Sequence, residues 1–255
     1  MVVDIHKAKK EFLKYTEKFD LKNENIKLKQ QHSLRVMKIS KEIAERLNLE
    51  KEEVDIATLI GLLHDIGRFK QYEKIGLADI MQGFDHGDYG VEILNTNIRD
   101  FIETEKYDEI IKKAIKNHNK YQIEEGLNEK ELLFAKIIRD ADKIDILYEC
   151  KDIFWKNKEE QINKSNISEY VYEQFKKQKL IKKEQDKIYS GIDGVILVLG
   201  YTFDINYKES YKIIKESNYI QDTIKRFTLE DKDTNKKVNE MIKILNNYIE
   251  IKEGK

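Results

Sequence analysis

Apolar residues recur at steps of three and four along most of the chain, which is the spacing of one face of an α-helix. A first stripe joins Ile5, Ala8, Phe12, Tyr15 and Phe19. A second joins His32, Val36, Ile39, Ile43 and Leu47. The same spacing returns within residues 107–118 and 134–148. We therefore expect amphipathic helices in these four segments, each with its apolar face towards a shared core.

Two neighbouring segments break this pattern in opposite ways. Residues 54–66, VDIATLIGLLHDI, are apolar nearly all round, which predicts a helix that is buried on most sides. Gly67 follows this helix and is expected to end it. From 68 to 85 the periodicity lapses, so we expect an irregular loop there, with a helix resuming at His86.

The remainder of the chain, residues 151–255, shows further amphipathic stretches at 168–180, 191–203, 207–217 and 234–251. The apolar run GVILVLGYTF at 194–203 could form a strand, but a helix is the favoured interpretation. Proline is absent and glycine occurs only 11 times, so the tight turns of a sheet are hard to supply. We predict an all-α fold with a core in residues 1–150. Residues 151–255 are expected to form a helical extension packed on the same core, as one structural unit.

Composition limits the choice of partners. The chain is 40% hydrophobic and 37% charged with a net charge of −1, which is typical of a globular protein and argues against a nucleic-acid partner. No apolar stretch reaches the ~18 residues of a membrane span. The single cysteine, Cys150, excludes internal disulfides and suits a reducing compartment, so a cytoplasmic location is expected. The oligomeric state is left open by these features.

Four of the five histidines fall one each on four successive predicted helices. They are His32, His64, His86 and His118. A fifth helix carries RDADKID, where Asp142 and Asp145 are three residues apart and therefore neighbours on one edge. In a helical bundle such stripes face a common axis, where metal sites are built from facing helices. Each histidine taken alone is more simply a buried residue bonded to backbone, but the ordered set favours a shared site.

Asp65 directly follows His64, and on a helix their side chains diverge by about 100°. That divergence suits two ligands on different sides of one metal ion, or a carboxylate that bridges two ions. With Asp142, the set offers six nitrogen and oxygen ligands and no sulfur. Such ligands favour a divalent Mn, Fe, Co or Ni ion over Zn or Mg.

Taken together, these motifs resemble the HD-domain superfamily of metal-dependent phosphohydrolases. The resemblance lies in QHSLRVMKIS, LIGLLHDIGRFKQ, FDHGDYGVEIL, IKNHNKY and IIRDADKIDIL, which span about residues 30–150. It implies an HD-domain helical bundle with a variable C-terminal extension. The positions that match the core metal ligands of the superfamily are His32, His64, Asp65 and Asp142. His86 and His118 match the extra ligands of members that bind two ions, or the phosphate contacts of members that bind one.

The resemblance implies hydrolysis of a phosphomonoester or phosphoanhydride by a metal-activated water. The expected partner is a small phosphorylated substrate of the nucleotide type. The absence of proline excludes the branch of the superfamily that carries a G-Y-P motif. The alternative is an HD fold that holds a metal and a nucleotide as a regulatory module, without turnover.

Catalytic roles are expected for four residues: Asp65 as a bridging carboxylate, Arg68 and Lys143 as cations that neutralise charge on phosphate, and Asp145 as a proton acceptor or orienting partner. Substrate contacts are expected from Arg68, Lys70, Tyr72, Tyr121 and Lys143, the tyrosines by stacking on a nucleobase. The competing interpretation treats the cations and Asp145 as solvated or paired surface residues. For the aromatic side chains, which include Phe69 and Phe84, packing in the core or a lid is favoured.

Overall fold

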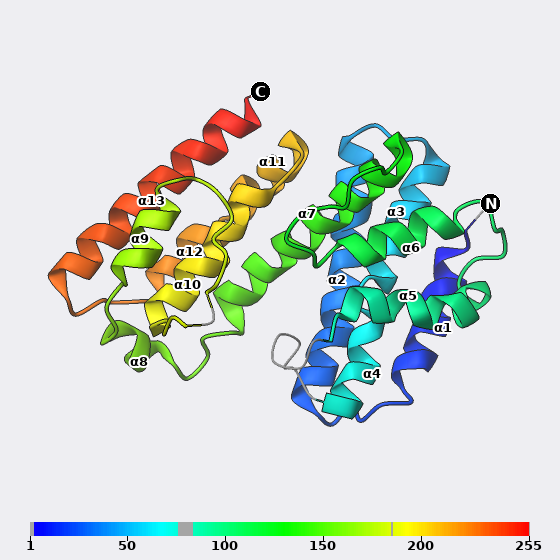
Figure 1. Cartoon of the computed structure of the whole chain (residues 1–255), viewed down its shortest axis with the longest axis horizontal. Coiled ribbons are helices and arrows are strands. Elements are labelled where there is room, and N and C mark those ends of the chain that lie inside the picture. Colours follow the sequence, from blue (N-terminus) through cyan, green and yellow to red (C-terminus); the bar gives the residue numbers. More distant parts are fainter. Residues whose placement is uncertain (1–2, 76–83, 185, 255) are drawn as a thin grey trace. The chain divides into compact units, whose positions relative to one another are not determined.

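The computed structural model describes residues 3–75, 84–184 and 186–254, and every regular element within these ranges is helical (Figure 1). The all-α prediction is therefore confirmed. The apolar run at 194–203 lies in helix α10 (Gly191–Leu199) and the 3₁₀ helix η2 (Gly200–Asp204), as favoured over a strand. The chain divides into two compact units, Met1–Asp142 and Lys143–Lys255, which are described separately.

The first unit contains seven α-helices among its described residues. They are α1 (Ile5–Thr16), α2 (Glu24–Arg46), α3 (Lys51–Leu63), α4 (Ile66–Ile75), α5 (His86–Asn97), α6 (Asp108–Asn117) and the first part of α7 (Glu129–Asp152), with the 3₁₀ helix η1 (Ile98–Asp100) after α5. α3 is the centre of the core, because each of its residues from Val54 to Leu63 is buried. α2 packs along it, and α1 and α6 also contact it. The prediction of a helix buried on most sides is confirmed.

Side-chain caps fix where two of the helices begin. The carboxylate of Asp85 accepts hydrogen bonds from the backbone N–H groups of Gly87 and Asp88, at 2.9 and 3.1 Å. This cap starts α5, so that His86 is its first residue. Asn128 and Glu131 exchange two hydrogen bonds, each side chain accepting from the other's backbone N–H, at 3.0 and 2.9 Å. This is a capping box at the start of α7, as the spacing indicates.

The prediction of an irregular loop over residues 68–85 is wrong for residues 68–75, which belong to α4. α4 has a buried side that the polar sequence conceals: Ile66 and Phe69 are almost fully buried. The Phe69 ring packs at 5.8 Å, between ring centroids, from both Phe12 and Phe19. Packing of Phe69 against α1 and the chain that follows it therefore supports a helix without a long stripe. Residues 76–83 of the predicted loop lie outside the described residues.

Gly67 also has a different role from the one expected. α3 ends at Leu63, and Gly67 lies in the first turn of α4 instead of ending α3. A Cβ atom at this position would lie 2.3 Å from the carbonyl oxygen of His86 and 2.8 Å from the backbone nitrogen of Gly90. The absence of a side chain therefore allows α4 to approach the backbone of α5 closely. His64 and Asp65 occupy the turn between α3 and α4, so the expected divergence around one helix does not apply to them.

Replacing Gly67 with alanine should lower the free energy of unfolding by about 1–3 kcal/mol, because the added methyl group meets backbone atoms that cannot rotate away. The midpoint of urea denaturation measures this effect. The matched control is Gly200→Ala, where the Cβ would sit 3.7 Å from the Phe175 ring, an ordinary contact. That variant should be as stable as the wild type or more stable. A Gly67→Ala protein of unchanged stability would contradict the close packing described here.

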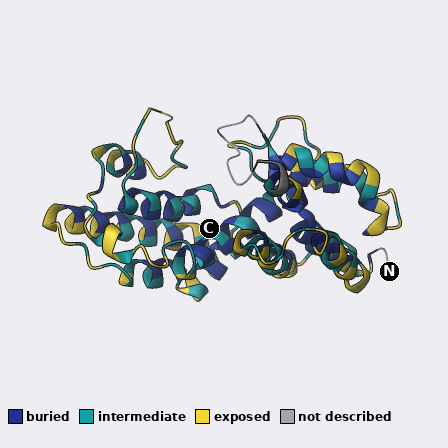
Figure 2. Cartoon of the chain, turned by 90° about the horizontal axis from the view of Figure 1, so that it is seen from below, coloured by how far each residue is buried: buried dark blue, intermediate teal, exposed yellow. Residues whose placement is uncertain are grey.

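The second unit consists of short helices and one long one. Besides the end of α7, α10 and η2, they are α8 (Glu159–Asn163), α9 (Glu169–Phe175), α11 (Lys208–Ser217), α12 (Tyr219–Lys225) and α13 (Lys232–Glu253). The buried residues of α10 and α13 build much of its core. Figure 2 shows buried residues of the chain in dark blue. Asp193, fully buried, completes a capping box with Ser190 at the start of α10. Within the described residues, no helix combines the length and the apolar character needed to cross a bilayer.

Candidate metal centre

Five helices of the first unit bring the predicted metal ligands together. His32 lies within α2, and His86 and His118 lie at the start of α5 and directly after α6. His64 and Asp65 form the turn between α3 and α4, and Asp142 lies on α7. The four imidazoles and Asp65 are at most 5% exposed, while the Asp142 side chain retains 17% exposure. The site is therefore almost closed, with one carboxylate at its accessible edge.

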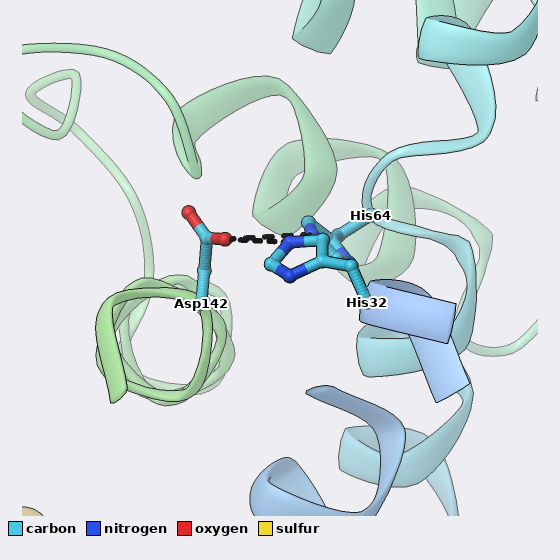
Figure 3. A group of neighbouring side chains, drawn as sticks. All are labelled: His32, His64 and Asp142. Carbon is cyan, nitrogen blue, oxygen red and sulfur yellow. Dashed lines mark hydrogen bonds and ion pairs between the residues drawn. The ribbon is translucent and has the colours of Figure 1, made fainter. Parts of the chain in front are cut away.

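One group of donors combines two imidazoles with Asp142 (Figure 3). The Nε2 atoms of His32 and His64 lie 3.2 Å apart. Oδ1 of Asp142 lies 3.0 Å from Nε2 of His32 and 3.6 Å from Nε2 of His64. These three side chains come from α2, the end of α3 and α7, and point at a single region.

A second pair of imidazoles lies on the other side of Asp65. The Nε2 atoms of His86 and His118 are 3.0 Å apart, and Oδ1 of Asp65 lies 3.4 and 3.5 Å from them. The other carboxylate oxygen, Oδ2, lies 3.7 Å from Nε2 of both His32 and His64. Each oxygen of Asp65 therefore faces its own pair of histidines.

Hydrogen bonds to the backbone set the tautomer of one histidine in each pair. Nδ1 of His64 lies 2.9 Å from the carbonyl oxygen of Gly61, and Nδ1 of His118 lies 2.6 Å from that of Ile115. A carbonyl can only accept, so both Nδ1 atoms carry the proton and donate it. Burial lowers the pKa of both imidazoles, which keeps them neutral. The Nε2 lone pairs are then available, which is the form of histidine that binds metal ions.

The spacing of the donors fits a divalent metal ion. Two ligands at about 2.1 Å from one ion are separated by roughly 3.0 Å in octahedral and 3.4 Å in tetrahedral geometry. The Nε2–Nε2 distances within the two histidine pairs, 3.2 and 3.0 Å, lie in or close to this range. In the described part of the first unit, His32, His64 and Asp142 form one group that could hold an ion, and His64, Asp65 and His118 form another.

Two cations compensate the buried carboxylate of Asp65. Nζ of Lys29 lies 3.1 Å from Oδ2, and Nε of Arg68 lies 3.7 Å from Oδ1. Burial would raise the pKa of Asp65, but the charge of Lys29 and the surrounding imidazoles outweigh it and hold the pKa well below its usual range. Burial likewise opposes ionisation of Asp142, and its interactions with His32 and His64 keep its pKa well below the usual range. Both carboxylates are therefore ionised at neutral pH, as ligands of a cation must be.

The other predicted site residues have varied positions. Lys70 is exposed, Tyr72 is partly exposed, and Tyr121 is 50% exposed. Burial raises the pKa of Tyr72, and the charge of Lys29 opposes this change. Arg68 donates to the buried side chain of Gln71, at 3.1 Å. Phe69 belongs to the core, the interpretation favoured for the aromatic residues, and the Phe84 ring packs 4.9 Å from that of Tyr89.

Lys143 and Asp145 belong to the second unit. Lys143 forms an ion pair with Asp204, with Nζ at 3.0 Å from Oδ2, and its side chain is only 9% exposed. Asp145 is buried, and its charge contributes to the raised pKa of Tyr219, whose first cause is burial. Both residues follow Asp142 on α7.

Three residues at the site were not identified from the sequence. Lys29 precedes His32 by three residues on α2, so helical spacing alone could have placed it next to the ligands. Nδ2 of Asn119 donates to Asp85, at 3.0 Å, and lies 3.3 Å from Nδ1 of His86. Arg139 contacts the backbone around His118. The contacts of Asn119 and Arg139 join segments far apart in the sequence, so no local pattern marks them.

The fold and these donors define a class of protein: an all-α bundle whose facing helices supply buried imidazole and carboxylate groups that could hold a metal ion. Residues 30–147, somewhat less than half of the chain, match the family model of the HD domain, so this segment is similar to the HD-domain family. Proteins with this domain are generally metal-dependent hydrolases, and some of them are not catalytic. No match is found among curated proteins or among solved structures.

The lowered pKa values of His64 and His118 predict how the stability of the metal-free protein depends on pH. Below the unfolded-state pKa of about 6.5, the unfolded chain takes up protons that the folded protein does not, so stability falls as the pH is lowered through this value. Each such histidine contributes a slope of at most about 1.4 kcal/mol per pH unit. Urea denaturation between pH 7.5 and 5, with a chelator present, measures the slope.

His64→Gln removes one titrating group and should make this slope shallower. The control is His6→Gln, at an exposed position on α1 outside the site, which should keep the wild-type slope. A slope that is the same for His64→Gln and the wild type would contradict the burial of a neutral imidazole at this position.

Proposed function

We propose that this protein is a metal-dependent phosphohydrolase that cleaves a phosphomonoester or phosphoanhydride of a nucleotide-like substrate. The observation that carries the proposal is the position of Asp65, whose two carboxylate oxygens each face a separate pair of imidazoles at 3.4–3.7 Å. A carboxylate placed in this way suits two metal ions better than one. The HD-domain match supports the reaction class.

The donors suit divalent transition metals. One ion would be held by His32, His64, Asp142 and Oδ2 of Asp65, and a second by His86, His118 and Oδ1 of Asp65. Mixed imidazole and carboxylate ligands without sulfur favour Mn, Fe, Co or Ni over Zn or Mg. When bound, such ions lower the pKa of water towards about 7 and withdraw charge from phosphoryl oxygens.

The charges of the site favour an anionic substrate. Asp65 and Asp142 carry two negative charges, and Lys29 and Arg68 carry two positive charges close to Asp65. These four groups balance one another, so each divalent cation that binds adds uncompensated positive charge to a nearly closed site. A phosphate group supplies the missing negative charge. Lys29 and Arg68, which lie near different oxygens of Asp65, would contact the oxygens of this phosphate group.

The side chains at the edge of the site support a substrate with an aromatic part. Tyr72 is partly exposed and lies four residues after Arg68, and Tyr121 is half-exposed three residues after His118. Aromatic rings stack on the faces of nucleobases. The neighbouring lysine and arginine would hold the phosphate while a tyrosine contacts the base, which is the arrangement a nucleotide requires.

Replacement of Asp65 should abolish the activity, because this residue contributes to both metal positions. Mn²⁺-loaded protein, screened against nucleoside mono- and polyphosphates and a simple aryl phosphate, should release inorganic phosphate from at least one of them. Asp65→Asn should reduce the rate by at least about 100-fold, since loss of a shared ligand exceeds the 10- to 100-fold effect of outer contacts. The matched control is Asp100→Asn, at an exposed acid on η1, which should retain wild-type turnover.

The same screen tests the alternative function. A protein that releases no phosphate from any compound, yet is stabilised against heat by a nucleotide, would be a regulatory module that binds without turnover. Full activity of Asp65→Asn would contradict the assigned site even if the wild type is a phosphohydrolase.

A further inference from the structure

We propose that Arg139 is a positioning residue that holds His118 in place, and that it determines whether the centre binds a second metal ion. The inference rests on the proposed two-ion site. It concerns a buried side chain on α7 that is not itself a ligand. It lies three positions before Asp142, so one helix carries both a ligand of the first ion and the residue that orients a ligand of the second.

The end of α6 creates the need for such a residue. A helix leaves its last carbonyl groups without partners inside the helix. His118 directly follows α6, and the chain then continues without helix to the start of α7. Carbonyl groups in this segment that are turned away from water need donors from elsewhere in the fold.

Arg139 supplies these donors. One terminal nitrogen, Nη1, donates to the carbonyl oxygens of Asn117, His118 and Lys120, at 3.0, 3.5 and 2.5 Å. The other, Nη2, donates to the carbonyl oxygen of Tyr121, at 3.4 Å. The side chain is only 3% exposed, so the guanidinium is enclosed by the backbone that it holds. Its positive charge also lies at the C-terminal, negative end of the α6 dipole.

The geometry requires arginine in particular. A guanidinium is planar and offers five N–H donors from three nitrogens, so it can span carbonyl groups on both sides of His118. A lysine ammonium offers its three donors from one atom, so it cannot occupy the positions of Nη1 and Nη2 at once and leaves part of this set of carbonyl groups without a donor. The imidazole of His118 depends on this backbone, because its Nδ1 donates to the carbonyl of Ile115 and its Nε2 lies 3.0 Å from that of His86.

These four hydrogen bonds of Arg139 all end on the backbone beside His118, a member of the second pair of histidines. They involve the segment that carries His118, whereas His32 and His64 are held by α2 and the end of α3. Asp142 remains on α7 whatever residue occupies position 139. Loss of the guanidinium should therefore weaken the second ion while leaving the donors of the first ion in place.

The test is the number of Mn²⁺ ions that the full chain binds, measured by calorimetric titration and by electron paramagnetic resonance of the free ion. The wild type should bind two ions. Arg139→Lys should weaken the second ion by about 10- to 100-fold, as removal of supporting contacts around metal ligands does, and leave the affinity for the first within about threefold. Arg139→Gln should weaken the second ion and spare the first in the same way. The matched control, Arg46→Lys, alters a surface ion pair with Glu42 and should bind as the wild type does.

Two further variants separate positioning from a general effect on folding. His118→Ala should reproduce the loss of the second ion. The double variant His118→Ala, Arg139→Lys should bind the remaining ion as His118→Ala does, because Arg139 acts through the residue already removed. A further loss in the double variant, or equal loss of both ions in Arg139→Lys and Arg139→Gln, would show that Arg139 supports the whole unit, and would overturn the inference.

The outcomes also distinguish this inference from the proposed function. Two ions in both the wild type and Arg139→Lys, at equal affinity, would overturn the role of Arg139 and leave the phosphohydrolase proposal intact. A wild type that binds only one ion would also overturn the role of Arg139. The protein could then still be a hydrolase that uses one metal ion. A wild type that binds no ion would refute the proposed function itself.

Discussion

The centre of the first unit depends on how the charge of one buried carboxylate is compensated. Asp65 is 3% exposed and lies among four imidazoles, with Lys29 and Arg68 as its nearest cations. A carboxylate in such surroundings is strongly destabilised unless cations or hydrogen-bond donors are close. Divalent metal ions on its two oxygens would provide stronger compensation than the two side chains. The helices around Asp65 are arranged to bring donors for such ions to the same place.

The two histidine pairs share one local construction. In each pair, one histidine directly follows the last residue of a helix and donates from Nδ1 to the carbonyl three residues earlier: His64 to Gly61 and His118 to Ile115. The partner in each pair lies 32 residues earlier in the chain. A backbone carbonyl at a helix end thus orients each of these two imidazoles through its Nδ1 atom. This hydrogen-bonded arrangement occurs once on each side of Asp65.

Much of the fold, and the meeting of the candidate ligands at one place, could be predicted from the sequence, because helical periodicity is local. Apolar residues at helical spacing predicted α1, α2, α6 and α7. The order of one histidine per helix indicated that the histidines share one site. Residues 68–75 were missed because their helix depends on Phe69 packing against Phe12 and Phe19, a contact between segments about 50 residues apart. Gly67 was assigned to the end of a helix because glycine is common there. Its actual role follows from the approach of α4 to α5, which no local pattern records.

The supporting residues were harder to predict than the ligands. Arg139 contacts carbonyl groups 18 to 22 residues before it, and these acceptors exist only once α6 ends where it does. Lys29 looks like any other lysine on a solvated helix until Asp65 is placed 3.1 Å from its ammonium. The chemistry of a ligand type is visible in its sequence motif, whereas the contacts that orient it depend on the folded arrangement.

Anomalous X-ray diffraction from crystals of the Mn²⁺-loaded protein tests the central claim most directly. The account predicts two peaks about 3.5–4 Å apart, the separation of two-metal sites. One should lie within bonding distance of His32 and His64, the other within bonding distance of His86 and His118, and each should contact a different oxygen of Asp65. A single peak, or two peaks of which only one contacts Asp65, would contradict the claim that this carboxylate joins two metal positions.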